Sequence, residues 1–472
     1  MSFERAPFIA IWETTRVYAL ACVHCRAEAQ PRRDPDELTT DEGKRLLERI
    51  STFGDPPPLV VLTGGDPLRR DDIEELVAYG AGLGLSVSLT PSGTAAVTAA
   101  RLRALRDAGL ARLAVSLDGA TAEAHDAFRR VRGSYRYTMR ILDHARALGM
   151  PRQINTTVSR QTVDDLPALA AQMPELGVAM WALFFLVPVG RASADQALGT
   201  AEIERVLEWA ADLVPRVSFG IKTTEAPHFH RVLAQRGTPA LMARADAVPG
   251  IGALAARRGI GRAGRAVTDG NGFVFVDHVW NVCPSGFLPL PVGNVRADDV
   301  VALYRQDPLF LALRDPRALR GRCGRCEYRD TCGGSRARAF ARAGDAFGED
   351  PGCAWEPALA GDRRRAATPA PIAGGSDAAP TVTPVQVTDA LRAVLDPELG
   401  MSVVDLGLVY GIEIDGGVVR ITTTVTAPGC PLHEVMTTWM REAVAGLPGV
   451  ERVDVTLTFD PPWTPERIVQ SR

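Results

Sequence analysis

Residues 60–68 read VVLTGGDPL, an apolar run that ends at two glycines. Five more short apolar runs lie between residue 8 and about residue 190: FIAIW, SVSLT, LAVSL, INTTV and ALFFLV. Longer amphipathic stretches separate them, such as TTDEGKRLLERIST (39–52), whose threonine cap and acidic first turn predict a helix. Strand followed by helix, six times, predicts an α/β fold with a parallel sheet, arranged as a partial (β/α)6 barrel. A doubly wound open sheet is the competing fold.

The residues that follow these runs are where a ligand is expected, because both folds bind ligands at the carboxyl ends of parallel strands. Gly64 and Gly65 follow the second run directly, and their missing side chains let backbone groups approach a ligand closely. Ser116 and Asp118 end the fourth run, and Asn155 lies in the fifth. Capping of strand ends is the competing interpretation of these polar side chains.

The length, charge and N-terminal sequence indicate the number of domains and the kinds of partner that the protein is expected to have. A chain of 472 residues predicts roughly two to four domains. Its 53 basic and 56 acidic side chains give a net charge of −3, so neither nucleic acid nor a membrane surface is an expected partner. The N-terminal sequence MSFERAPFIAIWE lacks the order of a signal peptide, and the apolar run 178–189 is too short for a bilayer and contains Pro188. We therefore expect a cytoplasmic protein that acts on a small molecule or a peptide.

The eight cysteines are unevenly spaced. Because the cytoplasm is reducing, we expect thiols rather than disulfides. Cys22 and Cys25 form a C-x-x-C pair within TRVYALACVHCRAEA (15–29), with His24 between them. A second group has the spacing C-x2-C-x5-C-x20-C and consists of Cys323, Cys326, Cys332 and Cys353. Four thiolates fit either a tetrahedral zinc ion or an iron–sulfur cluster.

Four parts of the chain differ in composition. The strand–helix alternation predicts a first domain over residues 1–230. Residues 231–360 form the next part, in which residues 271–360 lose the alternation and become rich in cysteine, glycine and arginine, which predicts a small cysteine-rich module held by metal. Residues 361–381, GDRRRAATPAPIAGGSDAAPT, have no periodicity and predict a flexible linker. Residues 382–472 contain two helical stretches and two strand-like runs, which predict a small C-terminal α/β domain.

With the glycine turn one strand after the C-x-x-C pair, the first 230 residues resemble the radical SAM superfamily. In that family a loop after the first barrel strand carries three cysteines spaced C-x3-C-x2-C, which hold three irons of a [4Fe-4S] cluster and leave the fourth iron for S-adenosylmethionine. Cys22 and Cys25 match the second and third cysteine, and Tyr18 occupies the first position. A phenol with a pKa of about 10 is a poorer iron ligand than a thiolate.

The resemblance implies a set of cofactor-binding residues and a reaction. The cofactor-binding residues are His24, Gly64, Gly65, Asp66, Ser116 and Asn155. An electron from a donor such as flavodoxin or ferredoxin would enter the cluster and split S-adenosylmethionine to a 5′-deoxyadenosyl radical, which abstracts hydrogen from a substrate in the barrel mouth. No residue of the chain is assigned a catalytic role, because the bond cleavage belongs to the cofactor.

The second cysteine group is similar to the auxiliary-cluster part of a SPASM or twitch extension, which implies one auxiliary [4Fe-4S] cluster. Fuller SPASM domains bind a second auxiliary cluster through additional cysteines, but Arg336 stands four residues after Cys332. Cys283 is interpreted as a buried thiol or as a rescue ligand. The stretch TEAPHFHR (224–231) is expected either to line the substrate cavity through Glu225, His228 and His230 or to be a solvated turn.

The C-terminal domain resembles small PaaD-like and SufT-like Fe–S assembly proteins. The matching stretches are DPELGMSVVDLGLVY (396–410), TAPGCP (426–431) and FDPPWTPER (459–467). Cys430 ends a strand and Pro431 suits the first turn of the next helix, whose dipole would lower the pKa of the thiol. The resemblance implies that Cys430 is an iron or cluster-transfer ligand and that proteins receiving Fe–S clusters are partners.

Two hypotheses follow for the whole chain. The first is a radical SAM enzyme, fused to its own cluster-assembly domain, that modifies a peptide, a cofactor precursor or a tetrapyrrole. The second takes Tyr18 as an inactivating substitution and interprets the chain as a catalytically silent factor that binds or delivers Fe–S clusters.

Overall fold

The computed structural model describes residues 3–18, 30, 32–236, 266–357, 382–392, 394, 401–425, 433–445, 447, 449–464 and 467. The chain forms two compact units, residues 1–365 and 366–472. Four residues singled out in the sequence lie outside the described residues: Cys22, His24, Cys25 and Cys430. The expected linker, residues 361–381, also lies outside them. None of the described helices is long and apolar enough to cross a membrane.

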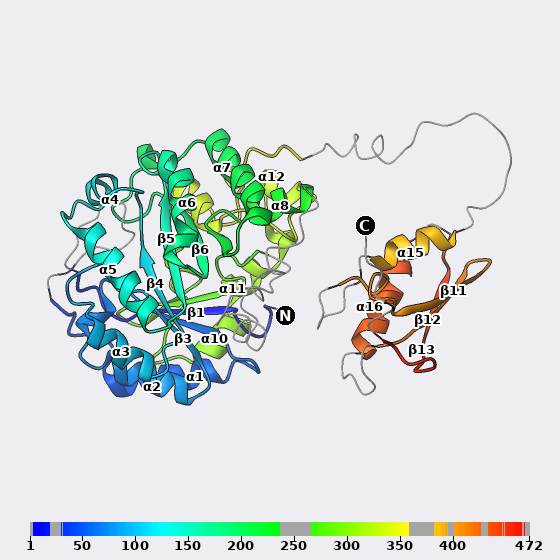
Figure 1. Ribbon diagram of the computed structural model, residues 1–472, viewed down its shortest axis with the longest axis horizontal. Helices are drawn as coiled ribbons and strands as arrows, with labels where there is room; N and C mark the ends of the chain where they lie inside the picture. Colours follow the sequence, from blue (N-terminus) through cyan, green and yellow to red (C-terminus); the bar gives the residue numbers. More distant parts are fainter. Residues whose placement is uncertain are drawn as a thin grey trace. The chain divides into compact units, whose positions relative to one another are not determined.

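A ten-stranded sheet lies at the centre of the first unit, in the order β10-β9-β8-β1-β2-β3-β4-β5-β6-β7 (Figure 1). The strands are β1 (Ile9–Glu13), β2 (Leu59–Thr63), β3 (Ser86–Leu89), β4 (Arg112–Ser116), β5 (Arg152–Val158), β6 (Met180–Phe185), β7 (Gly220–Thr224), β8 (Phe273–Val276), β9 (Asn281–Cys283) and β10 (Gly293–Asn294). Neighbours from β8 through β1 to β7 are parallel, whereas β9 pairs antiparallel with β8 and β10. The predicted parallel sheet is confirmed.

Helices connect the strands and surround the sheet (Figure 1). They are α1 (Thr40–Ser51), α2 (Ile73–Gly82), α3 (Ala99–Asp107), α4 (Ala122–Arg129), α5 (Ser134–Ala147), α6 (Leu166–Leu176), α7 (Thr200–Leu213), α8 (His228–Gln235), α10 (Val300–Gln306), α11 (Pro308–Arg314), α12 (Gly321–Arg325) and α13 (Arg336–Ala343). The expected cap of the first helix is present, since Thr39 and Glu42 form a reciprocal capping box. Leu46, Leu47 and Ile50 bury the inner face of α1 in the main core.

The sheet curls into a partial barrel rather than a doubly wound layer. Side chains from every strand between β1 and β8 line a single inner cavity, which a sheet covered by helices on both faces would not enclose. The sequence pattern predicts six strands, β1 to β6, and the structure adds β7 and β8. β7 reads GIKTT, in which Lys222 and two threonines conceal the apolar pattern of a strand.

The second unit is a small helix-on-sheet domain, as predicted. Its sheet has the order β11-β12-β13, with β11 (Val409–Asp415) and β12 (Val418–Thr423) antiparallel and β12 and β13 (Arg452–Leu457) parallel. The helices α15 (Pro384–Arg392) and α16 (His433–Ala445) contribute to one apolar core with these strands. This core includes Val387, Leu391, Val419, Ile421, Met436 and Met440.

Candidate functional site

The glycine turn after β2 packs directly against the segment that leads to the C-x-x-C pair. Gly65 N–H donates to the carbonyl oxygen of Thr15 at 2.7 Å, and Asp66 N–H donates to that of Val17 at 2.8 Å. A Cβ on Gly64, whose φ is +138°, would lie 2.3 Å from the oxygen of Thr15, and one on Gly65 would lie 2.2 Å from that of Val17. Both positions therefore require glycine, because two backbone segments meet there.

A mouth cavity of about 190 Å³ opens at the carboxyl ends of β2 to β6. The structure brings five of the residues predicted from the sequence together along its wall: Tyr18, Gly64, Gly65, Ser116 and Asn155. Phe184, Phe287 and the run Leu186–Val187 supply apolar surface to the same cavity. The wall thus combines backbone groups, small polar side chains and apolar surface, which suits a ligand with both polar and apolar parts.

Two aspartates near this cavity are buried in structural roles. Asp66 does not line the cavity; its Oδ1 accepts hydrogen bonds from the backbone N–H groups of Leu68 and Ser92, and burial raises its pKa. Asp118 accepts a hydrogen bond from Thr157 N–H at 2.7 Å and pairs with the Arg129 guanidinium, also at 2.7 Å. Asp118 therefore positions Arg129, which lines the mouth cavity and which the sequence pattern does not single out.

An inner cavity of about 200 Å³ occupies the interior of the barrel. It shares Thr63, Thr90, Asn155, Phe184 and Phe287 with the mouth cavity, so the two spaces adjoin. Its walls are largely apolar, with phenylalanine, isoleucine, leucine and valine side chains from β1, β2, β6 and β8. A ligand in the inner cavity would therefore contact one in the mouth cavity across Asn155 and the two phenylalanines.

Three ionisable side chains interrupt these apolar walls: Arg112 from β4, Lys222 from β7 and Glu225 after β7. Of the stretch 224–231, Glu225 lines the inner cavity, which is one of the two interpretations given for this stretch. His228 instead faces the second cysteine group, because α8 begins at this residue and turns away from the barrel interior. Sequence reasoning missed Arg112 and Lys222, although a single cation at an inward position of an apolar strand is a readable signal.

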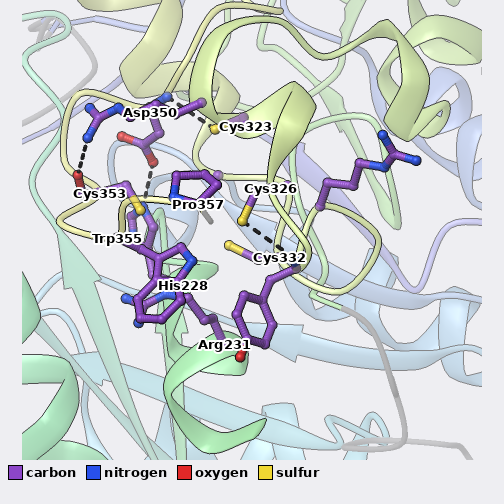
Figure 2. A pocket seen from close by; sticks show the side chains of 14 residues that line it. His228, Arg231, Cys323, Cys326, Cys332, Asp350, Cys353, Trp355 and Pro357 are labelled. Carbon is purple, nitrogen blue, oxygen red and sulfur yellow. Dashed lines mark hydrogen bonds and ion pairs between the residues drawn. The ribbon is translucent and has the colours of Figure 1, made fainter. Parts of the chain in front are cut away.

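The second cysteine group surrounds a separate cavity, here called the cysteine pocket (Figure 2). Its wall contains Cys323, Cys326, Cys332 and Cys353, together with His228, Arg231, Tyr328 and Trp355. Cys283 is buried at the end of β9 and is not one of the residues that line it. Among the described residues, no group of three or more His, Cys, Asp or Glu side chains is arranged to hold a metal ion.

Hydrogen bonds point at all four sulfur atoms: the backbone N–H groups of Gly334 and Trp355 donate to Cys332 and Cys353, and other donors reach the remaining two. Tyr328 N–H donates to Cys326 Sγ at 3.4 Å, and Asp350 N–H and Arg336 Nη2 donate to Cys323 Sγ at 3.4 and 3.5 Å. Burial raises the pKa of Cys353 to about 11 and that of Cys332 well above its usual range. A cationic iron or zinc centre bound here would favour the thiolate forms.

A buried set of charges supports the cysteine pocket. His228 Nε2 lies 2.9 Å from Asp350 Oδ2, and both residues are labelled in Figure 2. Arg338 Nη1 lies 3.1 Å from the same carboxylate. Ser335 N–H also donates to Asp350, and Ser335 Oγ donates to Glu225 Oε2 at 2.6 Å. Although burial opposes ionisation, the charges of Arg338 and His228 hold the pKa of Asp350 well below its usual value. This network connects the cysteine pocket to the wall of the inner cavity.

The fold and the two sites define a class of protein, partial β/α barrels with a cavity at the mouth and a separate cysteine-lined pocket. Family models support this class. Residues 13–173 match the model of the radical SAM superfamily, and residues 384–456 match that of the iron-sulfur cluster assembly proteins.

Known proteins resemble most of the first unit. The chain is 38% identical over 348 residues to the AdoMet-dependent heme synthase of Oleidesulfovibrio alaskensis, covering 73% of this chain and 87% of that one. It is 32% identical over 411 residues to the mycofactocin maturase of Mycobacterium tuberculosis, covering 83% and 94%. The crystal structure of Streptococcus suis SuiB bound to S-adenosylmethionine shares the fold, with a TM-score of 0.56 at 15% identity over 74% of this chain and 78% of that one.

These similarities establish the family. The chain belongs to the radical SAM superfamily and carries an iron-sulfur cluster assembly domain at its C-terminal end.

Proposed function

We propose that this protein is a cytoplasmic radical SAM enzyme that modifies a tetrapyrrole, with S-adenosylmethionine in the mouth cavity and the substrate in the inner cavity. The observation that carries the proposal is that the two cavities adjoin at Asn155, Phe184 and Phe287. A cofactor in one cavity and a substrate in the other would therefore contact each other within one barrel. The similarity to a heme synthase over 87% of that protein supports a tetrapyrrole, and the largely apolar inner wall suits a flat apolar ring.

The residues that would hold the first cluster are Cys22 and Cys25, with Tyr18 at the position of the first cysteine. Tyr18 lies on the wall of the mouth cavity, the space that the cofactor would fill. Phenolate oxygen does serve as an iron ligand in some proteins, but it is harder than thiolate sulfur. When bound, the cluster and S-adenosylmethionine together supply radical abstraction of a hydrogen atom.

The chain's own residues bind, orient and exclude water. The glycine turn offers backbone groups of residues 64 and 65 to the methionine part of the cofactor, while Ser116 and Asn155 offer short polar side chains for its orientation. Arg129, fixed by Asp118, adds a positive charge to the same wall. Phe184 and Phe287 supply apolar surface at the junction of the two cavities, which would limit the access of water to a reactive intermediate there.

The cysteine pocket is proposed to hold one auxiliary [4Fe-4S] cluster through Cys323, Cys326, Cys332 and Cys353. Four sulfur donors fit this group, and N–H groups already aimed at them would stabilise thiolates and influence the reduction potential. Flavodoxin or ferredoxin is the proposed electron donor. The C-terminal domain is proposed to deliver Fe–S clusters to this chain or to other proteins, with Cys430 as the transfer ligand.

The alternative, a catalytically silent cluster-binding factor, follows from Tyr18. The deciding experiment compares the natural protein with Tyr18→Cys after anaerobic reconstitution, with 5′-deoxyadenosine measured by chromatography. We expect the natural protein to form this product and the variant to form it about tenfold faster, because a third thiolate holds the cluster more firmly. Product from the variant alone would establish the silent factor. Equal rates would show that another ligand completes the site.

A further inference from the structure

Two cations, Arg112 and Lys222, line the inner cavity. Arg112 is the first residue of β4, and its side chain lies along the amino ends of the next strands, where Nη1 reaches Gln153 Oε1 at 3.0 Å. Lys222 is in the middle of β7, in register with Ala182 and, through it, with Asn155. It is one of only two lysines in the chain. Among the described residues, the charged side chain that acts electrostatically on Lys222 is Arg112, which is also a cation.

Among the described residues, no carboxylate neutralises this pair. The partners of the Arg112 guanidinium are the neutral amide of Gln153 and the sulfur of Met180, and no hydrogen bond or ion pair within the described part of the chain reaches Lys222 Nζ. Glu225, the one carboxyl on the described wall of this cavity, is engaged with Ser335. Burial and the neighbouring Asp269 raise the pKa of Glu225 well above its usual value, which disfavours its charged form.

A cation buried among apolar side chains without an anionic partner lowers the stability of the fold, because its charge has lost its hydration. A ligand that supplies the opposite charge offsets this cost. Burial lowers the pKa of Arg112 to about 10, and burial together with the charge of Arg112 lowers that of Lys222 to about 8. Both values follow from the absence of a nearby anion in the described cavity. The other walls are mostly apolar, so the expected ligand has an apolar body and few charges.

We propose that Arg112 and Lys222 together bind a carboxylate of the substrate inside the barrel, so that the substrate is a tetrapyrrole bearing carboxylate side chains. This inference rests on the proposed function, because it takes the inner cavity as the substrate site. A planar guanidinium and an ammonium group give a carboxylate charge-assisted hydrogen bonds from two directions.

The same pair is connected to the border between the two cavities. Gln153 accepts from Arg112 and donates through Nε2 to Asn155 Oδ1 at 2.7 Å. A carboxylate held by Arg112 would therefore fix Gln153 and, through it, the orientation of the Asn155 amide at the boundary with the mouth cavity. Arg112 and Lys222 are substrate-binding residues in this scheme, and Gln153 is a positioning residue.

The first test measures binding of two porphyrins to the full chain without turnover. The probes are coproporphyrin III, which has four carboxylates, and its tetramethyl ester, followed by absorbance and fluorescence titration. Arg112→Met and Lys222→Met should each weaken binding of the acid by about tenfold and leave the ester unchanged. Lys44→Met is the control, because Lys44 lies on the surface and pairs with Glu75. Unchanged affinity for the acid in both cavity variants would overturn the proposal.

The second test uses acetylation and mass spectrometry on the unmodified chain. The chain has two lysines, so Lys222 reports on the proposed site and Lys44 serves as an internal reference. Coproporphyrin III should protect Lys222 from acetic anhydride at least about fivefold and leave Lys44 unaffected, given that a paired ammonium group is a poor nucleophile. Equal protection by the ester, or protection by an acidic peptide and not by the porphyrin, would overturn the assignment. Porphyrin binding and protection of Lys222 are both measured without cleavage of S-adenosylmethionine. The enzyme proposal is tested by formation of 5′-deoxyadenosine, so a failure of one proposal can be told from a failure of the other.

Discussion

The mouth cavity and the cysteine pocket are built by different means. In the mouth cavity, Gly64 and Gly65 allow two backbone segments to touch, and Tyr18 stands where relatives of this superfamily are expected to carry a thiol. In the cysteine pocket, four thiols line the wall and buried charges around Asp350 support it. The first site depends on backbone geometry, which a change of one side chain leaves intact. The second depends on side-chain chemistry throughout.

This difference explains how the mouth cavity keeps its shape although Tyr18 replaces a cysteine. The contacts of the glycine turn run to the carbonyl oxygens of residues 15 and 17, not to the side chain of Tyr18. A tyrosine in place of a cysteine at position 18 therefore changes the atom offered to an iron ion and leaves the backbone contacts of the glycine turn in place. A corresponding change in the cysteine pocket would remove both a ligand and an acceptor of N–H hydrogen bonds.

The largest expected effect is the loss of iron from the cysteine pocket. Cys323→Ser removes a proposed ligand and the acceptor for Asp350 N–H and Arg336, so iron bound by this pocket should fall to background after reconstitution. Iron is measured by elemental analysis, with Cys283→Ser as the matched control for a buried thiol outside the pocket. Finding zinc in the natural protein, or equal iron in the two variants, would contradict an auxiliary cluster at this place.

The next effect concerns the charges that support the pocket. Asp350→Asn leaves Arg338 and His228 buried without their carboxylate, which should lower the free energy of unfolding by about 3–5 kcal/mol at pH 7. Urea denaturation of the full chain measures it. Asp315→Asn, which breaks an exposed pair with Arg317, should cost less than about 1 kcal/mol. Similar losses in both variants would show that the buried network contributes little.

The same aspartate gives this stability a pH dependence. The pKa of Asp350 is held below its usual value, so the folded chain binds the proton less tightly than the unfolded chain, whose aspartates titrate near about 3.9. The contribution is complete above that range and is lost as the pH falls below it. Denaturation between pH 7 and pH 3 should therefore show a steeper acid loss in the natural protein than in Asp350→Asn.

The smallest of these effects tests the backbone geometry of the mouth cavity. Gly64→Ala places a Cβ against the oxygen of Thr15 at a φ that other residues avoid, which should cost about 1–3 kcal/mol of stability. Binding of S-adenosylmethionine to the reconstituted protein should weaken about tenfold when measured by calorimetry, because the turn moves. Gly54→Ala is the control, since no atom lies within 4 Å of its added Cβ. Normal binding by Gly64→Ala would remove the turn from the cofactor site.

Local pattern predicts the fold better than the site. The apolar runs identify β1 to β6 because each contains buried apolar side chains within a short stretch, whereas Lys222 conceals β7. The placement of Tyr18, Ser116 and Asn155 in one cavity follows from the rule that parallel strands end at one edge. That His228 faces the cysteines and that Arg112 approaches Lys222 depend on side chains brought together by the curl of the sheet, which no local pattern records.

The pairing of β8 with β1 bears on how the molecule is made. Ile9 to Trp12 lie beside Phe273 to Val276, so the first strand of the barrel has its second neighbour only from a segment far downstream. During synthesis the edge of β1 therefore stays open until the ribosome has released residue 276. An exposed strand edge of this kind recruits other chains, so a gene shortened before β8 should yield aggregates rather than a smaller enzyme.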